Sequence, residues 1–302
     1  MAEGTGPVQA EALSAARMPW SPHGDTAANL AIASLRDSVL ASLKGERGIH
    51  AETLFVTIGA IAGQAVAHAV WEQVHDGKVL LKEISARGGL HLFFGEELNA
   101  YLVPQAGSLL PIWNLVAGAA VEAGVPMAEL PDWQEIFAHV SRTAAGAEFG
   151  IVRTPQEHQP GLQPRQALRL VWPLAHAILS SPVTESLSTT PGPSQGEDVN
   201  PPESFGVGKP MRGMFGRKGA PPPGSQTGLQ PGSHTGPQAE TFAKKYWPIG
   251  VGLVAQQYVR MSKDLLDPRL AVRLFMEAAV PMSKLNPQEF PLKPMRHLVG
   301  AA

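Results

Sequence analysis

The segment from residue 51 to residue 75 carries three side chains that could bind a metal ion. His68, Glu72 and His75 are spaced i, i+4 and i+7, so they share one face if the segment is helical. Imidazoles and carboxylates are ligands that Zn²⁺ accepts. The spacing does not match His-Glu-x-x-His, so no metalloprotease signature applies. The alternative, which we favour, is a solvated helix edge on which Glu72 pairs with His68.

A second set of polar side chains is spread along the chain instead of forming one motif. Carboxylates and imidazoles that meet in one pocket suit general acid–base chemistry or metal binding. The candidates for this ligand pocket are His50, Glu52, His91, Glu135, His139, Glu148 and Arg153. Each also has a structural explanation: Glu135 could cap a helix, for example, and Arg153 could hold a loop.

Glu52 differs from the other candidates because helical spacing directs it toward an apolar face, together with Val56 and Gly59. A buried carboxylate needs a partner, such as His50, Arg153 or a backbone amide. If burial shifts its pKa, it becomes a functional candidate. The alternative is an acidic residue in the first turn that stabilises the N-terminus of its own helix.

Hydrophobic periodicity and capping residues predict the helices that must position these groups. The expected helices cover about 26–44, 51–75, 110–123, 132–146, 165–180, 248–262 and 268–280, with one or two turns at 96–102. Asp132 and Glu135 predict a capping box, and Pro173 predicts a kinked or split helix. Two short apolar runs, 78–85 and 90–95, surround a glycine-containing turn and predict a β-hairpin.

The 51–75 helix also has to be judged as a possible membrane span. Its apolar part, residues 54–70, includes Thr57, Gln64 and His68, and a span needs about 20 mainly apolar residues. Gly59 and Gly63 form a GxxxG pattern, which packs helices closely in membranes and in soluble cores alike. We therefore expect no membrane span. The prediction is a core helix with one polar stripe made of Thr53, Thr57, Gln64, His68, Glu72 and His75.

Composition excludes several classes of function. Hydrophobic residues make up 44% of the 302 positions, charged residues 17%, and the net charge is -2. This balance attracts neither nucleic acid nor an anionic membrane. The absence of cysteine excludes disulfides, thiolate ligands and a cysteine nucleophile. No nucleotide-binding fingerprint, Walker sequence or Gly-x-Ser-x-Gly elbow is present, and the first residues lack the pattern of a secretory signal. The expected location is the cytoplasm.

Proline and glycine mark the boundaries of the folded part. Residues 181–238 hold 11 prolines and 11 glycines in 58 positions, a composition typical of disorder. We interpret this segment as an insertion within one helical domain formed by residues 25–180 and 239–302, after a disordered N-terminus at 1–24. The basic segment 209–219, KPMRGMFGRKG, could dock on a partner or could simply keep the linker soluble.

Five segments resemble a group of uncharacterised bacterial proteins: HAETL at 50–54, FFGEELN at 93–99, PDWQEIFAHV at 131–140, EFGIVRTPQEH at 148–158 and MEAAVPMSK at 276–284. The group has no established activity. The resemblance therefore implies a bacterial source and a single domain, and assigns no catalytic residue.

The expected fold is mainly α, a single helical domain with a small β-hairpin, interrupted by a long disordered insertion. The first hypothesis is a cytoplasmic helical interaction module that binds a protein partner or associates with itself. Its basis is the low charge, the GxxxG helix and the lack of a catalytic signature. The alternative is an enzyme that binds a metal or small ligand in a His/Glu pocket. The sequence names no cofactor and no catalytic residue.

Overall fold

The computed structural model describes residues 19–20, 25–105, 110–183 and 240–289. Apart from residues 19 and 20, the N-terminal segment predicted to be disordered lies outside these residues. Of the predicted insertion, residues 181–238, the part from 184 to 238 also lies outside the described residues, with the basic segment at 209–219.

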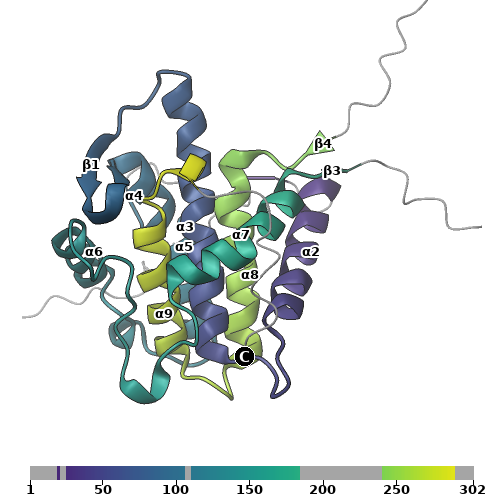
Figure 1. Cartoon of the computed structure of the whole chain (residues 1–302). Coiled ribbons are helices and arrows are strands. Elements are labelled where there is room, and N and C mark those ends of the chain that lie inside the picture. Colours follow the sequence, from purple (N-terminus) through teal and green to yellow (C-terminus); the bar gives the residue numbers. More distant parts are fainter. Residues whose placement is uncertain (1–18, 21–24, 106–109, 184–239, 290–302) are drawn as a thin grey trace, which may run out of the picture. The chain divides into compact units, whose positions relative to one another are not determined.

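Within the described residues the fold is mainly α-helical with a small β-hairpin, which confirms the predicted fold class (Figure 1). The helices are α2 (Thr26–Leu43), α3 (Ala51–His75), α4 (Glu96–Leu102), α5 (Ile112–Glu122), α6 (Trp133–Thr143), α7 (Pro164–Ser180), α8 (Trp247–Ser262) and α9 (Pro268–Met282). The hairpin pairs β1 (Lys82–Ala86) with β2 (Leu90–Phe94) in antiparallel register. A second short pair joins β3 (Pro182–Val183) to β4 (Glu240–Thr241).

Local signals explain where the helices begin. The Asp25 carboxylate accepts a hydrogen bond from the Ala28 amide at 2.9 Å, and Asp267 accepts one from the Arg269 amide at 2.8 Å, next to Pro268 in the first turn. These are the side-chain caps that a helix N-terminus needs, because its first amides have no partner within the helix.

One local prediction was wrong, and one of the two alternatives predicted for Pro173 is excluded. Asp132 caps α6 by accepting from the Gln134 amide, but Glu135 does not complete a capping box because its carboxylate pairs with Arg153. Pro173 does not split its helix, since α7 continues from residue 164 to residue 180 with the proline inside it. Proline has no backbone N–H to donate within the helix, and the packing of α7 against α2 and α3 offsets the loss of this hydrogen bond.

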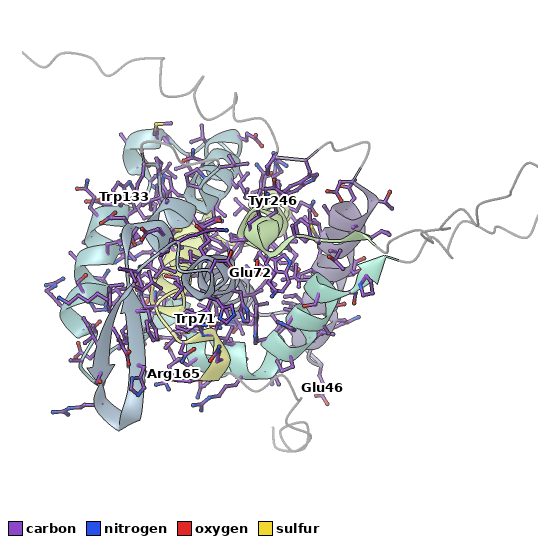
Figure 2. The ribbon with its side chains drawn as sticks, turned by 90° about the horizontal axis from the view of Figure 1, so that it is seen from above. Glu46, Trp71, Glu72, Trp133, Arg165 and Tyr246 are labelled. Atoms are coloured by element: carbon purple, nitrogen blue, oxygen red, sulfur yellow. The ribbon has the colours of Figure 1, made fainter. Side chains whose placement is uncertain are left out.

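Helix α3 forms the centre of the fold, and α7, α8 and α9 pack around it. In Figure 2 the view runs along α3, and the labelled Trp71 and Glu72 lie near the middle of the surrounding helices. The elements before residue 184 and those after residue 239 form one compact unit. The core is therefore built from both described parts of the chain, with α8 and α9 completing the burial of α3.

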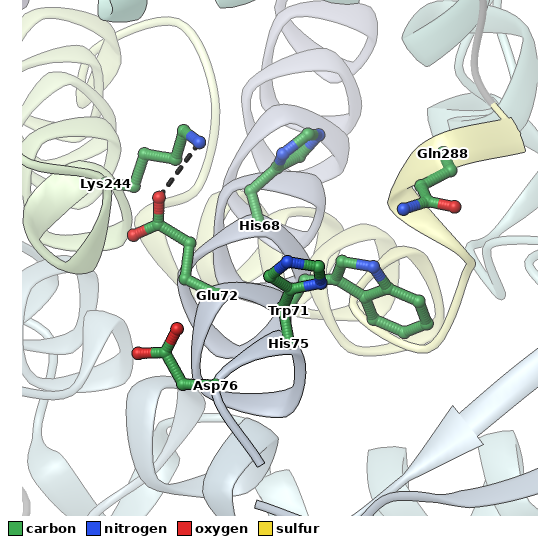
Figure 3. A pocket seen from close by; sticks show the side chains of 7 residues that line it. All are labelled: His68, Trp71, Glu72, His75, Asp76, Lys244 and Gln288. Atoms are coloured by element: carbon green, nitrogen blue, oxygen red, sulfur yellow. Dashed lines mark ion pairs between the residues drawn. The ribbon is translucent and has the colours of Figure 1, made fainter. Parts of the chain in front are cut away.

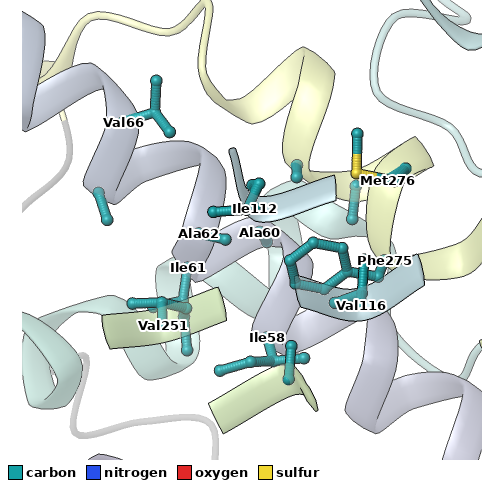
Figure 4. Packing of buried hydrophobic residues seen from close by; sticks show 14 of the residues in the cluster. Ile58, Ala60, Ile61, Ala62, Val66, Ile112, Val116, Val251, Phe275 and Met276 are labelled. Carbon is teal, nitrogen blue, oxygen red and sulfur yellow. The ribbon is translucent and has the colours of Figure 1, made fainter. Parts of the chain in front are cut away.

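The GxxxG pattern brings α3 against α9. A Cβ atom at Gly63 would lie 2.3 Å from the carbonyl oxygen of Ala279, and one at Gly59 would lie 2.3 Å from that of Phe275. Only glycine permits this approach. Around the contact, Ile58, Ile61, Val116, Val251 and Phe275 interlock as part of the hydrophobic core (Figure 4).

One described helix, α3, is long and apolar enough to cross a membrane. However, 94% of its most apolar window is buried inside the fold. This burial is what the helix of a protein core requires, so the structure gives no clear membrane span.

Candidate functional site

The polar stripe of α3 is solvated only at its C-terminal end, where Glu72 and His75 are exposed as the sequence suggested. Thr53, Thr57 and Gln64 are buried, and the Thr57 hydroxyl donates to the carbonyl of Thr53 at 2.7 Å. The two amide atoms of Gln64 are buried with no hydrogen-bond partner in the described part of the chain. The polar side chains of this stripe therefore extend into the hydrophobic core.

His68 lies in an aromatic cluster with Trp172, His176 and Trp247. Its ring stacks on Trp172 at a centroid distance of 5.1 Å, and His176 and Trp247 lie at 5.4 and 5.9 Å. Burial, with His176 and Lys244 nearby, lowers the pKa of His68 to about 3. The ring is therefore neutral at physiological pH.

The predicted pairing of His68 with Glu72 is wrong. The carboxylate of Glu72 instead forms an ion pair with Lys244 at 2.9 Å, as the dashed line in Figure 3 shows.

The three predicted metal ligands do line one pocket, of about 480 Å³. The pocket is lined by His68, Trp71, Glu72, His75, Asp76, Lys244 and Gln288 (Figure 3). Nowhere among the described residues, however, do three His, Asp or Glu side chains group as metal ligands. With Glu72 held by Lys244, the geometry gives the metal site no support.

Glu52, the first member of the predicted ligand pocket, is buried next to two histidines. Its carboxylate lies 2.9 Å from Nδ1 of His158 and 3.5 Å from Nδ1 of His50. Burial alone would raise the pKa of Glu52, but the hydrogen bond from His158, the backbone amide and the two imidazoles together lower it. Beside it, the Thr53 hydroxyl accepts from the amide of Gly161 at 2.8 Å. This cluster fixes the 158–161 loop to the start of α3.

Glu135, His139 and Arg153 gather around a carboxylate that the sequence analysis missed, Glu277 on α9. The Glu277 side chain is 2% exposed and forms an ion pair with the Arg153 guanidinium at 2.9 Å. It also accepts from the Arg153 amide at 2.6 Å, and Arg153 reaches Glu135 at 3.1 Å.

His139 lies near this group and is poorly suited to carry charge. Burial and the positive charge of Arg153 lower the pKa of His139, against the opposing effect of Glu277, and Glu148 is also close enough to act on it. The arrangement is a salt-bridge network that holds the 148–158 loop to α9.

His91 stands apart on the hairpin, where it pairs with the exposed carboxylate of Glu83. No hydrogen bond or ion pair within the described part joins the Glu52 group to the Glu277 group or to His91. The structure therefore does not bring the seven predicted residues into one pocket. The sequence did not show which loop packs against which helix.

A better-formed site surrounds Lys284, directly after α9. Lys284 is 2% exposed and lines a pocket of about 330 Å³. The other lining residues come from the hairpin and α4 (Lys82, Phe94, Gly95, Glu96 and Asn99), from α6 (Phe137, Val140 and Ser141) and from α9 (Val280). The backbone of Lys284 is fixed because its carbonyl accepts from the Phe93 amide at 2.7 Å.

The ammonium group of Lys284 has an unusual environment. It donates to the side-chain oxygen of Asn99 at 2.8 Å, and the rings of Phe94 and Phe137 lie 5.7 Å away. No carboxylate of the described residues lies within ion-pair distance of it. Burial lowers the pKa of Lys284 to about 7, although Glu96 acts in the opposite direction. A substantial fraction of this amine is therefore unprotonated at neutral pH.

A short chain of hydrogen bonds orients the side chain of Asn99, which accepts the hydrogen bond from Lys284. The side-chain amide of Asn99 donates to Glu96 at 3.5 Å, and Gln105 donates to the same oxygen of Glu96 at 3.0 Å. These contacts direct the Asn99 oxygen toward the lysine. The sequence analysis missed the site, although one signal was available: Glu277 and Lys284 are charged, seven residues apart and set in an otherwise apolar segment.

No family model, curated protein or solved structure matches the chain. The five segments quoted in the sequence analysis, at 50–54, 93–99, 131–140, 148–158 and 276–284, contact one another in space. Glu52 meets His158, Arg153 meets Glu277, and the Lys284 pocket takes residues from three of the segments.

Proposed function

We propose that the protein binds a small organic molecule in the pocket around Lys284 and that Lys284 contacts this ligand directly. The observation that carries the proposal is a buried lysine that lines a pocket and has no carboxylate partner among the described residues. Buried lysines are almost always paired. An unpaired one, with a shifted pKa, is typical of a functional site.

The pocket walls indicate the size and character of the ligand. A volume of about 330 Å³ accommodates roughly ten non-hydrogen atoms, taking about 30 Å³ for a water-sized group. Phe94, Phe137 and Val140 would contact an apolar body, as in most small-molecule sites. At the rim, Lys82 is exposed and forms no ion pair with any described residue, so it is free to pair with an anionic group. An aromatic or branched carboxylate satisfies these features.

Ligand-observed NMR tests this proposal, with 4-(hydroxymethyl)benzoate as the probe. We expect saturation transfer to the probe from the full chain. In Lys284→Met the affinity should fall by about tenfold or more, which corresponds to a loss of about 1.4 kcal/mol or more.

Lys78→Met is the matched control. Lys78 pairs with Asp76 on the surface, and its side chain is 69% exposed. Equal binding by the parent, the control and Lys284→Met would overturn the proposal, and so would the absence of binding by the parent. A native mass spectrum of the purified chain would show any ligand that copurifies.

The interaction module remains a second proposal, but the structure removes the surface that suggested it. The glycine face of α3 packs against α9 of the same chain, so self-association would have to use another surface. Sedimentation of the purified protein tests this hypothesis. A monomer at all accessible concentrations, recovering no partner protein, would count against it. In either case we expect the protein in the cytoplasm.

A further inference from the structure

We propose that Lys284 forms an imine with the carbonyl group of its ligand, and that the ligand is an oxo acid or a carboxylated aldehyde. This inference rests on the proposed function and deepens it by naming the ligand class and the chemical step.

The first argument concerns the nucleophile. An amine attacks a carbonyl carbon only in its unprotonated form, and lysines become reactive when they are desolvated in an apolar pocket. Lys284 meets this condition, because it is buried beside Phe94 and Phe137, and within the described part of the chain its side chain donates one hydrogen bond, to a neutral amide oxygen. A directly paired carboxylate would hold the proton on the lysine, and no described carboxylate lies within ion-pair distance of it; Glu96 acts from farther away, and burial outweighs its effect.

The second argument concerns the charge that the reaction creates. The nitrogen lone pair forms the new C–N bond, and the carbonyl oxygen leaves as water with the two amine hydrogens. Uptake of one proton from solvent then gives the iminium ion. Its positive charge arises 5.7 Å from the centres of two phenyl rings, whose faces attract cations. Glu96, which favours positive charge on Lys284, adds to this stabilisation.

The third argument concerns the ligand. Lys82 lies on β1 at the rim and Lys284 lies in the interior, so one lysine is available for a carboxylate and the other for the carbonyl. The apolar walls between them favour an aromatic or branched carbon skeleton. Asn99 is a positioning residue because it holds the amine of Lys284 through its side-chain oxygen.

Reductive trapping tests the proposal on the full, unmodified chain. The probe is 4-formylbenzoate with cyanoborohydride at pH 7, and the labelled lysine is located by peptide mass spectrometry. The hydrogen bond to Asp76 raises the pKa of Lys78, so very little of its amine is unprotonated at pH 7, whereas burial lowers the pKa of Lys284 to about 7. We expect Lys284 to be labelled on the order of a hundredfold faster than Lys78, because its larger share of free amine outweighs its lower basicity.

Three comparisons complete the experiment. Benzaldehyde, which lacks the carboxylate, should label Lys284 more slowly, and Lys82→Met should remove this difference. Asn99→Leu should change the rate of labelling at Lys284 without moving the label to another lysine. Excess 4-(hydroxymethyl)benzoate, which binds without a carbonyl, should protect Lys284.

The outcomes separate this inference from the proposed function. Binding of 4-(hydroxymethyl)benzoate without labelling of Lys284 by the aldehyde would overturn the imine and leave the binding site standing. Labelling of Lys284 at the rate of Lys78 would have the same meaning. If neither compound binds, both proposals fail. Because the label is located in the parent chain, the result does not depend on whether any variant folds.

Discussion

Replacement of Gly63 by alanine should destabilise the protein because α3 and α9 touch at that position. The added Cβ atom would lie 2.3 Å from the carbonyl oxygen of Ala279, 2.8 Å from the amide nitrogen of Ser283 and 2.9 Å from the Cβ of Met282. None of these atoms ends a flexible side chain. The two helices must therefore move apart to relieve the overlap.

Two opposing effects set the change in the free energy of unfolding of Gly63→Ala. Alanine is favoured over glycine inside a helix by about 1 kcal/mol. Overpacking a well-packed core costs about 1–3 kcal/mol and sometimes more, and a contact with backbone atoms belongs at the upper end. We expect Gly63→Ala to lower the free energy of unfolding by about 2 kcal/mol in total, the upper-end overpacking cost less the gain in helix propensity.

Gly118→Ala is the matched control. Gly118 lies inside α5, and a Cβ atom there would meet no atom of the described residues within 4 Å. This variant keeps the gain in helix propensity without the overlap, so it should stabilise the protein by up to about 1 kcal/mol.

Urea unfolding followed by circular dichroism measures both variants. The expected gap between their unfolding free energies is about 3 kcal/mol, which is the overpacking cost alone because both variants share the gain in helix propensity. If Gly63→Ala is as stable as Gly118→Ala, the close contact between α3 and α9 does not exist. The position is also close to the proposed site, because Ser283 directly precedes Lys284.

Three further predictions concern buried polar groups. Glu277→Gln should lower the free energy of unfolding by about 1–3 kcal/mol because Arg153 and Arg273 lose their buried counter-charge. The control Glu122→Gln, which breaks an exposed ion pair, should lower it by under about 1 kcal/mol. Equal losses for the two variants in urea unfolding would contradict this prediction. Because the folded-state pKa of Lys284, about 7, lies below its unfolded value, the penalty is full below pH 7 and is relieved as pH rises toward 10.5. The parent should therefore gain up to about 1.4 kcal/mol per pH unit over Lys284→Met between pH 7 and pH 9, and parallel stability curves would refute the shift. Gln64→Met should raise the free energy of unfolding by about 1–2 kcal/mol, since the Gln64 amide is buried without a described partner; an unchanged or lower thermal midpoint would show that the amide is satisfied.

The helices could be predicted because their signals are local. Asp25, Asp132 and Pro268 mark helix starts within one turn of where they act, and the hairpin follows from two apolar runs around a turn. Such signals need only a few neighbouring residues. The prediction failed where a distant segment competes for a local group, as when Arg153 takes Glu135 away from its expected cap.

The polar stripe of α3 shows why residue type did not reveal exposure. The Thr57 hydroxyl bonds to its own helix backbone, so it needs no solvent. His68 loses its charge and stacks between aromatic rings that arrive from α7 and α8. Neither outcome can be read from periodicity, because both depend on which side chains the neighbouring helices supply.

The candidate site was hidden for a related reason. Its lysine lies at the end of a helix that the sequence presents only as framework, and its wall comes from a hairpin almost 200 positions earlier in the chain. Helical spacing places Glu277 and Lys284 on the same face of α9 or its continuation. Helical spacing could not show which residues contact Glu277 and which contact Lys284.

The residues around them distinguish Glu277 from Lys284, two buried charged residues that look alike in the sequence. Glu277 receives the Arg153 amide and the guanidinium groups of Arg153 and Arg273, so its charge is compensated on every side and its role is to hold a loop. Lys284 receives one neutral amide oxygen and two phenyl rings. Burial without compensation is costly, and a fold that only needed to fill this space could do so with methionine. A use for the free amine would explain this cost, and for that reason we propose a functional role for Lys284 and a structural role for Glu277.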